Sequence, residues 1–565
     1  MRAPTISRIA FSARCLRSLK RPRRWYSSCA ESKRAFQHNR MPLRNLLIGS
    51  AVGTVVALTE WSIKNDQFSS TTPLSELESP QYCRDGKKFE EAVARLKEVL
   101  KNDAECYSVS KSDLEAHSDT YFNTHKATQE QRPQIILFPR STHDVSEIMK
   151  ICHEYAIPVI PFSGGTSLEG HFLPTRVGCT VVVDISKFMN QIVQLNSLDL
   201  DVQVQAGVAW EDLNEYLAEH GLLFGCDPGP GAQIGGCIAN SCSGTNAYRY
   251  GTMKENVVNI TAVLADGTIV KTKRRPRKSS AGYNLNGLLV GSEGTLAIVT
   301  EATVKCHVRP VKETVVVGSF PDVGAAAACT SKIIQEGIQL NAMELLDDNM
   351  MEIINRGGAT SRTDWLEQPT LFFKIGGRND AIIQEVIGEV SRIAEDHGCR
   401  KFEYAKDEDE KLELWEARKV ALWSAINEGR AKDSSVNLWT TDVAVPLSQF
   451  SKVIEATKEE MSGSGLANAI VGHAGDGNFH AFILYTDAER QRATELVDNM
   501  VKRAIDADGT CTGEHGVGIG KRGFLVAELG DAPVDLMRTL KLAMDPKRIL
   551  NPDKVVKTDP RDHEA

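Results

Sequence analysis

The chain has 565 residues, of which 42% are hydrophobic and 25% are charged, and its formal net charge is −8. This is the composition of a globular protein that is long enough for two domains. Because residues 1–40 hold eleven Lys or Arg and one acid, the rest of the chain carries a charge of about −18, which argues against nucleic acid as a partner.

Residues 1–26 are predicted to be a mitochondrial presequence. The first forty residues are rich in Arg and Ser, and Glu31 is their lone acid. The stretch 24–28 resembles a processing site, which places cleavage near Tyr26. A basic tail exposed to solvent is the alternative interpretation.

Residues 42–61 are predicted to anchor the chain in the mitochondrial inner membrane. The uncharged apolar run from Leu46 to Leu58 is short for a span, which needs about 20 residues, but Arg44 and Lys64 at its flanks could extend towards the membrane surface. A processed leader is the alternative. The Ser-, Thr- and Pro-rich residues 62–87 are predicted to form a linker.

Residues 88–310 are predicted to form a first domain. A helical period over 89–100 is followed by a strand, a helix and a further strand from Ile135 onwards. Short strands are then expected at 202–208, 260–264 and 297–307.

A change of composition after Pro310 predicts a second domain over 311–545, with residues 546–565 returning to the first domain. Strands and helices alternate in this domain, and the order predicts an antiparallel sheet covered by helices on one face, as in ferredoxin-like folds. The fold class is therefore α+β. The elements are expected at 314–320, 325–337, 371–376, 385–398, 441–445 and 469–471.

Three glycine-rich loops lie in the first domain, at 161–170, 227–251 and 291–299. Paired glycines let backbone N–H groups approach an anion closely, although one such loop alone could be a tight turn. The second loop is so dense in Gly, Pro, Ser and Asn that it could press its backbone against a large flat ligand. The three loops together predict a phosphate-containing cofactor.

Other cofactor sites are disfavoured by the same residues. The glycines from Gly229 to Gly235 have the wrong spacing for a dinucleotide fingerprint, and Pro230 interrupts them. The chain contains no G-x-x-x-x-G-K-[ST] motif. Its 13 cysteines include no C-x-x-C pair, so cysteine ligation of zinc or an iron–sulfur cluster is not expected.

The segment 472–480 reads GHAGDGNFH and predicts two strands around a turn. If residues 475–478 form the turn, His473 faces His480, and the two Cβ atoms lie about 5 Å apart. Both imidazoles could then reach one divalent ion.

A second glycine-framed segment, GEHGVG, places Glu514 beside His515. Two histidines and one carboxylate suit a catalytic Zn²⁺ or a similar divalent ion that keeps open positions for a bidentate hydroxy acid. His515 would then be free to act as a base. The alternative is that these are turn glycines with incidental histidines.

The three loops PFSGGTSLEG, DPGPGAQIGGCIANSCSGTNAYRYG and GSEGTLAIVTEATVK resemble the PCMH-type FAD-binding domain of the vanillyl-alcohol oxidase superfamily, and the resemblance covers about residues 130–555. It implies a bound FAD, held noncovalently because Ser163 stands where some relatives carry an attachment residue. The implied FAD contacts are Pro161, Ser163, Gly164, Gly165, Thr166, Ser167, Pro228, Gly229, Ala232, Gly235, Gly236, Ala239, Gly244, Tyr248, Gly251, Glu293, Gly294, Ile298 and Asn551.

The motifs GHAGDGNFH and GEHGVG resemble those of the D-lactate and D-2-hydroxyglutarate dehydrogenase branch of this superfamily. The resemblance implies that His473, His480 and Glu514 bind the metal and that His515 acts on the substrate. The segment 414–419 matches the branch's helix, whose arginine, here Arg418, holds the substrate carboxylate as a bidentate fork. An exposed helix arginine is the alternative interpretation of Arg418.

Two positions bear on substrate size by the same resemblance. Hydroxyglutarate enzymes use a Lys and an Asn where this chain has Thr440 and Phe482, so a short apolar substrate is expected. The prediction is oxidation of D-lactate to pyruvate, with cytochrome c as electron acceptor. A D-2-hydroxyglutarate or glycolate dehydrogenase with a flavoprotein acceptor, and a membrane-tethered binding protein without chemistry, are the alternatives.

Overall fold

The computed structural model describes residues 70–121 and 123–562. The predicted presequence and the predicted anchor at 42–61 lie outside these residues. Within the described part of the chain, none of the helices is both long enough and apolar enough to span a bilayer.

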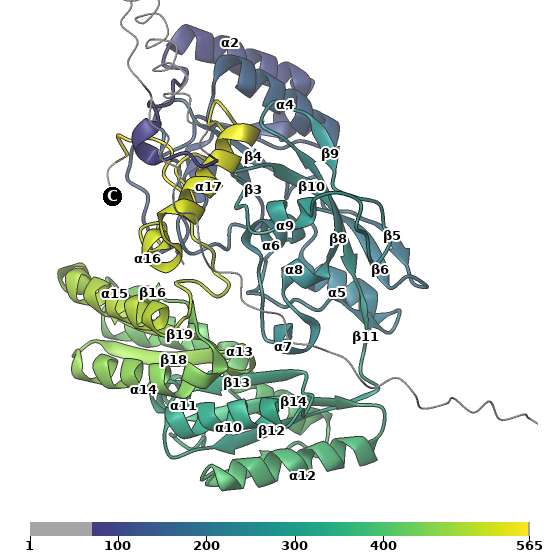
Figure 1. The fold of residues 1–565 in the computed structure, drawn as a ribbon, viewed down its shortest axis with the longest axis vertical. Helices are drawn as coiled ribbons and strands as arrows, with labels where there is room; N and C mark the ends of the chain where they lie inside the picture. Colours follow the sequence, from purple (N-terminus) through teal and green to yellow (C-terminus); the bar gives the residue numbers. More distant parts are fainter. Residues whose placement is uncertain (1–69, 122, 563–565) are drawn as a thin grey trace, which may run out of the picture. The chain divides into compact units, whose positions relative to one another are not determined.

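The first sheet has the strand order β1-β2-β4-β3, and β2, β4 and β3 run parallel (Figure 1). Its central strands are runs of Ile, Leu and Val, with Asp184 at the end of β4, as expected for a parallel sheet that is covered on both faces. The sheet and the two helices that pack together beside it comprise β1 (Tyr107–Ser108), β2 (Ile135–Leu137), β3 (Val159–Phe162), β4 (Val181–Asp184), α2 (Gly86–Val99) and α4 (Thr142–Tyr155).

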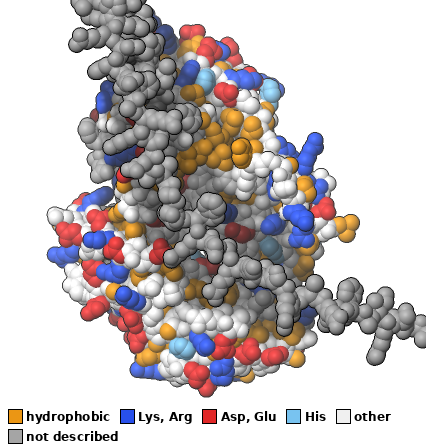
Figure 2. All heavy atoms as spheres, viewed as in Figure 1, with side chains coloured by type: hydrophobic (Ala, Val, Ile, Leu, Met, Phe, Trp, Pro, Cys, Tyr) orange, Lys and Arg blue, Asp and Glu red, His pale blue; other side chains and the backbone are white. Residues whose placement is uncertain are grey.

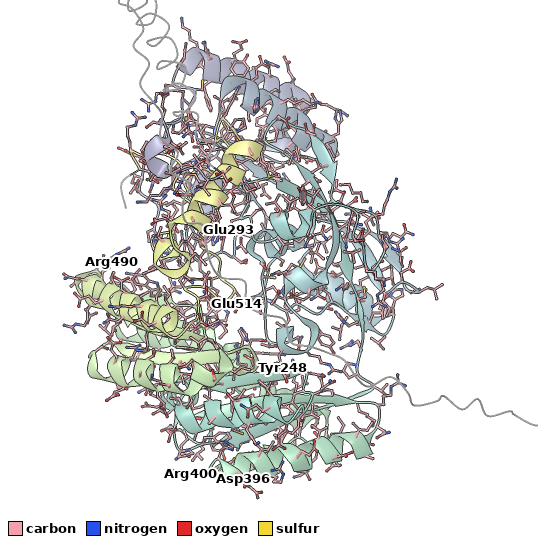
Figure 3. The ribbon with its side chains drawn as sticks, in the orientation of Figure 1. Tyr248, Glu293, Asp396, Arg400, Arg490 and Glu514 are labelled. Carbon is pink, nitrogen blue, oxygen red and sulfur yellow. The ribbon has the colours of Figure 1, made fainter. Side chains whose placement is uncertain are left out.

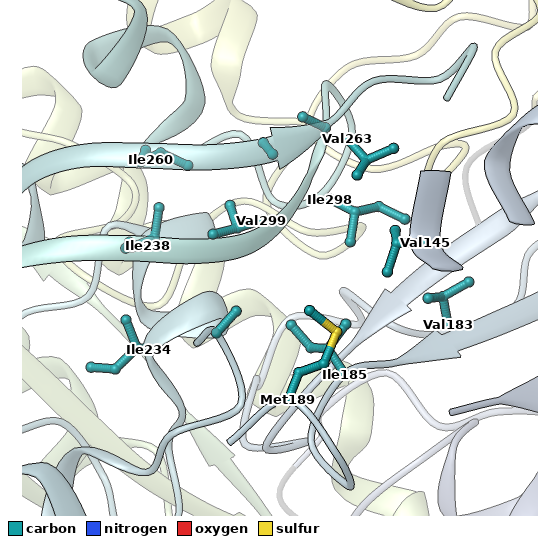
Figure 4. Close-up of a cluster of buried hydrophobic side chains, with 14 of the residues drawn as sticks. Val145, Val183, Ile185, Met189, Ile234, Ile238, Ile260, Val263, Ile298 and Val299 are labelled. Carbon is teal, nitrogen blue, oxygen red and sulfur yellow. The ribbon is translucent and has the colours of Figure 1, made fainter. Parts of the chain in front are cut away.

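The second sheet is antiparallel, with the order β5-β6-β10-β8-β9. Side chains from both sheets meet in one buried core, to which Val145 of α4 and Ile238 of α6 also contribute (Figure 4). This core places the loop after β3, the loop around α6 and the loop before β10 at one junction. The elements are β5 (Ile192–Asn196), β6 (Asp201–Gln205), β8 (Val257–Val263), β9 (Ile269–Lys271), β10 (Ile298–Lys305) and α6 (Ile234–Asn240).

The largest sheet has the order β15-β12-β14-β13-β18-β19-β16, and every neighbouring pair of these strands is antiparallel. In chain order its first four strands stand as 4-1-3-2, which is the ferredoxin-like arrangement, and the expected α+β class is confirmed. We call this part of the chain the cap. Its strands are β12 (Lys312–Ser319), β13 (Ala342–Leu346), β14 (Thr370–Gly377), β15 (Lys401–Tyr404), β16 (Asn437–Thr440), β18 (Ala467–His473) and β19 (Asn478–Tyr485).

Helices cover both faces of the cap sheet, so the expectation of one covered face is wrong in this respect. Along β14, Leu371 and Phe373 belong to one core, whereas Phe372 between them belongs to the other. The second face was missed because its long helix α13 is highly charged and contacts the sheet partly through small residues. The helices on the first face are α10 (Val323–Gln335), α12 (Asp380–Asp396), α14 (Leu447–Gly463) and α15 (Arg490–Asp506), and those on the second are α11 (Asp348–Gly357) and α13 (Glu408–Lys432).

The end of the chain packs on the first domain. Leu550 forms a parallel bridge with Val159 of β3, and the Asn551 side chain donates a hydrogen bond to the carbonyl of Glu293. Helix α17 (Asp531–Met544) leads into this segment, and its Lys541 donates to the carbonyl of Thr295. The third glycine-rich loop is therefore held in place by residues 541–551.

Candidate active site

The three glycine-rich loops approach one another so closely at some positions that only glycine fits. A Cβ added to Gly164 would lie 2.4 Å from the carbonyl oxygen of Gly231, and one added to Gly294 would lie 2.9 Å from Pro161. The Ser163 hydroxyl donates to the side chain of Gln233 at 2.6 Å. The first loop therefore contacts both of the others, and together they form a cradle lined largely by backbone.

The residues expected to contact FAD fall into two groups. At Gly229 and Gly236 an added Cβ would meet open space, which fits glycines that face a ligand. At Gly235 it would lie 2.8 Å from Ala206, and the Ile298 side chain is buried in the hydrophobic core, so at these two positions the predicted contact to FAD would come from the backbone. The donor-rich, open part of the cradle fits a diphosphate-containing cofactor such as FAD.

Glu293 has a different environment from the one expected. Its carboxylate accepts the backbone N–H groups of Val517 and Gly518, at 2.6 and 2.8 Å, and it lies 3.1 Å from His171 Nε2. The side chain thus binds the GEHGVG segment of the cap. Its contact to FAD would come from its backbone, which is held in the left-handed region at φ 53°.

The imidazoles of His473 and His480 converge on one carboxylate oxygen. The distances to Glu514 Oε1 are 2.9 Å from His473 Nε2 and 3.2 Å from His480 Nε2. Both histidines are buried. The three ligand atoms all lie within 4.8 Å of one another, which is close enough for them to bind one metal ion.

The second nitrogen of each imidazole is occupied. His473 Nδ1 lies 2.9 Å from Glu344 Oε1, and His480 Nδ1 lies 2.9 Å from the carbonyl of Thr441. Burial opposes the charged form of His473, but the carboxylates of Glu344 and Glu514 raise its pKa well above the ordinary value, so without a metal its Nε2 donates to Glu514. A metal ion would take the place of that Nε2 proton, whereas each Nδ1 keeps its proton for the acceptor behind it. This is the usual outer-shell arrangement of metal-binding histidines, and the donor set of two nitrogens and one carboxylate fits a divalent transition metal.

The hairpin that carries these histidines has a different register from the one expected. His473 pairs with Asn478, and His480 pairs with Val471. The turn comprises Ala474 to Gly477, because Gly477 adopts the left-handed conformation at φ 67° and closes a short 3-10 turn. His473 and His480 are diagonal neighbours on one face, and their ring centroids lie 5.5 Å apart.

Arg418 is joined to the same cluster through Glu344. Its Nε donates to Glu344 Oε2 at 2.7 Å, while Oε1 of that carboxylate holds His473. Glu344 lies in the buried strand β13 and was not found from the sequence. A carboxylate inside the apolar run Ala-Met-Glu-Leu-Leu was the available signal.

Asp442 orients the Glu514–His515 peptide. Its Oδ2 accepts both backbone N–H groups at 2.9 Å and the Thr512 hydroxyl at 2.7 Å. These bonds occupy the carboxylate, so Asp442 is a poorer metal ligand than Glu514, although it forms a second close group with His480 and His515. The inward turn of Asp442 also splits the strand expected at 441–445, since β16 ends at Thr440 and β17 is Val443–Ala444.

His515 stacks on His480, with ring centroids 4.7 Å apart and planes inclined by 10°. Removal from water lowers the pKa of His515 to about 4, so its imidazole is neutral at neutral pH. Its Nδ1 has no hydrogen-bond partner among the described residues. A neutral imidazole with a free nitrogen beside the ligand cluster can accept a proton.

Lys521 joins this part of the cap to the first domain. Its Nζ lies 3.5 Å from Asp442 Oδ2 and 3.4 Å from Glu169 Oε1, and all three side chains are buried. Figure 3 shows Glu293, Glu514 and Tyr248 one below another along the boundary between the two domains. The site is therefore assembled from both domains.

Comparison with known proteins agrees with this architecture. Residues 133–273 match the FAD binding domain family, and residues 309–555 match the C-terminal domain of FAD linked oxidases. The mitochondrial D-lactate dehydrogenase [cytochrome] of Kluyveromyces lactis is 70% identical over 88% of this chain and 86% of its own. The chain belongs to this family of flavin-dependent dehydrogenases.

Two further relatives extend the comparison. D-lactate dehydrogenase [cytochrome] 1, mitochondrial, of Saccharomyces cerevisiae is 63% identical over 95% of this chain and 91% of its own. The solved structure of 4-ethylphenol oxidase from Gulosibacter chungangensis is similar in fold, with a TM-score of 0.69, 18% identity, and coverage of 86% of this chain and 99% of its own. The family matches and the two yeast relatives confirm the expected superfamily, and the solved structure confirms the fold.

Gly164→Ala is expected to abolish most flavin binding, because the new Cβ would overlap the Gly231 carbonyl at 2.4 Å and force the first two loops apart. The matched control is Gly388→Ala in α12, where the added Cβ meets open space. Flavin content per purified chain, read from the visible spectrum, measures the effect. Equal flavin content in the two variants would contradict the placement of FAD on these loops.

Proposed function

We propose that this chain oxidises D-lactate to pyruvate with FAD and passes the electrons to cytochrome c in the mitochondrion. The observation that carries the proposal is the convergence of His473, His480 and Glu514 beside Arg418 and His515. The names of the relatives at 70% and 63% identity supply the substrate, the acceptor and the compartment.

A divalent metal, with Zn²⁺ as the first candidate, would be held by His473, His480 and Glu514. When bound, it supplies Lewis acidity that lowers the pKa of a substrate hydroxyl. FAD would be held by the three glycine-rich loops, and when bound it accepts a hydride from the substrate carbon and releases the electrons singly.

The chain's own residues then have separate tasks. Arg418 Nε is engaged by Glu344, so the terminal nitrogens of its guanidinium remain to hold the substrate carboxylate. His515 takes the hydroxyl proton as the Cα–H bond breaks, since it is neutral and its Nδ1 is free. Asp442 keeps His515 in place through its backbone N–H.

A small substrate is supported by the surroundings of the second motif histidine. Thr440 and Phe482 are cross-strand partners, so the two positions that suggested a short substrate lie side by side. Phe482 shares the sheet face of His480 and packs with Ala469 and Val471. The apolar wall formed by these three side chains offers no positive charge to the distal carboxylate of a longer substrate.

One observation favours a longer acid as a second candidate. Lys374 lies on the same sheet face as Glu344, its ammonium stands 4.1 Å from the Trp415 ring centroid, and it forms no ion pair with the described residues. A free cation at this position would suit the distal carboxylate of D-2-hydroxyglutarate.

The acidic character of the chain outside residues 1–40 supports a basic electron acceptor. The inner-membrane location depends on residues 42–61, which lie outside the described residues, and it stays a prediction.

D-lactate is expected to bleach the bound flavin faster than D-2-hydroxyglutarate, glycolate or L-lactate does. The apolar wall at Phe482 would favour the methyl group of lactate, and the fixed Arg418 and His515 would select the D configuration. Anaerobic stopped-flow spectroscopy of the wild-type protein measures the four rates. Faster bleaching by D-2-hydroxyglutarate would reverse the substrate assignment in favour of the Lys374 site.

His515→Ala should retain flavin but slow its reduction by D-lactate about 10²–10⁴-fold, which is the usual contribution of a general base. His220→Ala is the matched control, since His220 is exposed at the end of α5 (Trp210–Ala218). Rapid bleaching in the His515 variant would reject its role as base.

His480→Ala should lower the affinity for a divalent metal by about 100-fold or more, because loss of an outer-shell partner alone costs 10–100-fold. Flavin content should stay at the wild-type level, since the ligand set does not include the glycine-rich loops. Elemental analysis after dialysis measures the metal, and His220→Ala again serves as control. Unchanged metal content in His480→Ala would exclude this ligand set.

A further inference from the structure

A dense group of cations lies in the first domain, between the second and the third glycine-rich loop. Residues 267–292 contain six Lys or Arg and no Asp or Glu, in a chain whose net charge is −8. The segment leaves the edge strand β9 and returns through the short helix α9 (Leu285–Leu289). We call residues 272–286 the basic loop.

The basic loop is fastened across one end of the second sheet. Its first residue, Thr272, donates its N–H to the carbonyl of Ile260, and its last, Asn286, donates to the carbonyl of Val258. Between them, Arg275 pairs with Asp199 at 2.7 Å and with Asp201 at 3.2 Å. The loop therefore lies beside the turn that joins β5 to β6.

Arg275 forms ion pairs within the described part of the protein, whereas its exposed neighbours do not. Arg274, Arg277 and Lys278 are exposed and form no ion pair with the described residues. Burial and, after it, the positive charges of Lys305, Arg277 and Arg249 lower the pKa of the His307 imidazole to about 4. Positive charge therefore also surrounds His307, in the same region of the first domain. The cations are thus concentrated without acidic partners.

Two apolar side chains project from the same end of the sheet. Leu198, in the β5–β6 turn beside Asp199, is 100% exposed, and Tyr283 of the basic loop is 95% exposed. In Figure 2, Lys and Arg side chains gather near the right-hand edge, where the β5–β6 end of the sheet lies in Figure 1. Exposure of the Leu198 side chain and the Tyr283 ring to water has a free-energy cost that an apolar partner would remove, although the Tyr283 hydroxyl can hydrogen-bond to water.

We propose that this end of the first domain binds the surface of an anionic lipid bilayer, with Arg274, Arg277 and Lys278 at the head groups and Leu198 and Tyr283 entering the interface. Clusters of cations are attracted to anionic membranes, and each Lys or Arg near the surface raises the binding constant about fivefold. Apolar side chains at the tips of turns can enter a fluid interface but find no preformed pocket there. This surface is independent of the substrate assignment.

Hydrogen–deuterium exchange of the full chain tests the surface locally. Vesicles of phosphatidylcholine with phosphatidylglycerol should protect residues 269–290, whereas vesicles of phosphatidylcholine alone should not. Added salt should weaken the protection, because the attraction of the cations is screened. The local measurement separates this contact from any contribution of residues 1–61, which are present throughout.

The triple variant Arg274→Gln, Arg277→Gln, Lys278→Gln should bind the anionic vesicles about 100-fold more weakly in sedimentation, at about fivefold for each cation. The control triple Arg84→Gln, Lys87→Gln, Lys88→Gln removes the same charge from exposed residues at the start of α2 and should bind as the wild type does. Both variants should reduce a soluble acceptor with D-lactate at the wild-type rate.

Three results would overturn the membrane surface. They are equal binding by the two triple variants, equal protection by neutral vesicles, and equal protection of the basic loop by dissolved heparin, which would indicate a general site for polyanions. Failure of D-lactate oxidation in every form of the protein would instead reject the proposed function, so the two failures are distinguishable.

Discussion

The geometry of the active site depends on the buried carboxylate of Asp442. By accepting the backbone N–H groups of both Glu514 and His515, it fixes the carboxylate of the ligand set and the proposed base on one rigid peptide. Burying a carboxylate costs several kcal/mol unless hydrogen bonds and an opposite charge compensate it. Lys521 supplies that charge and also reaches Glu169 of the first domain, so the interaction that shapes the site also joins the two domains.

The glycines of the GEHGVGIG segment follow from this docking. An added Cβ at Gly518 would lie 2.0 Å from the carbonyl of Glu169, and one at Gly520 would lie 2.1 Å from His125. Gly518 also adopts a positive φ of 51°. These glycines let the backbone of the segment pass close to the first domain, where the Glu293 carboxylate accepts hydrogen bonds from two of its N–H groups. Their role is to bring His515 from the cap to the domain that holds the flavin loops.

The parts of the site that are local in sequence could be predicted, and the parts that depend on long-range contacts could not. The motif around His473 and His480 indicated paired imidazoles, although its register is shifted because the turn conformation depends on Gly477. Glu344 lies 129 residues before His473, and the sequence around Glu344 does not indicate that the two side chains are in contact. The α+β class followed from alternating strands and helices, whereas the second covered face of the cap sheet did not, because α13 packs through Ala417, Ala421 and Ala425 beneath a charged surface.

A charge needs a partner when it is buried but not when it is exposed, and this rule applies to both the interior and the surface of the protein. At the active site each buried charge has a partner: Glu344 holds Arg418 and His473, and Lys521 lies between Asp442 and Glu169. An exposed cation needs no partner, so a single unpaired Arg carries little information. A run of six cations without an acid, beside two almost fully exposed apolar side chains, departs from this background because Arg275 alone among the six has acidic partners in the described part of the chain. Arg275 therefore holds the basic loop in place through its acidic partners, whereas the exposed cations of the loop face outwards.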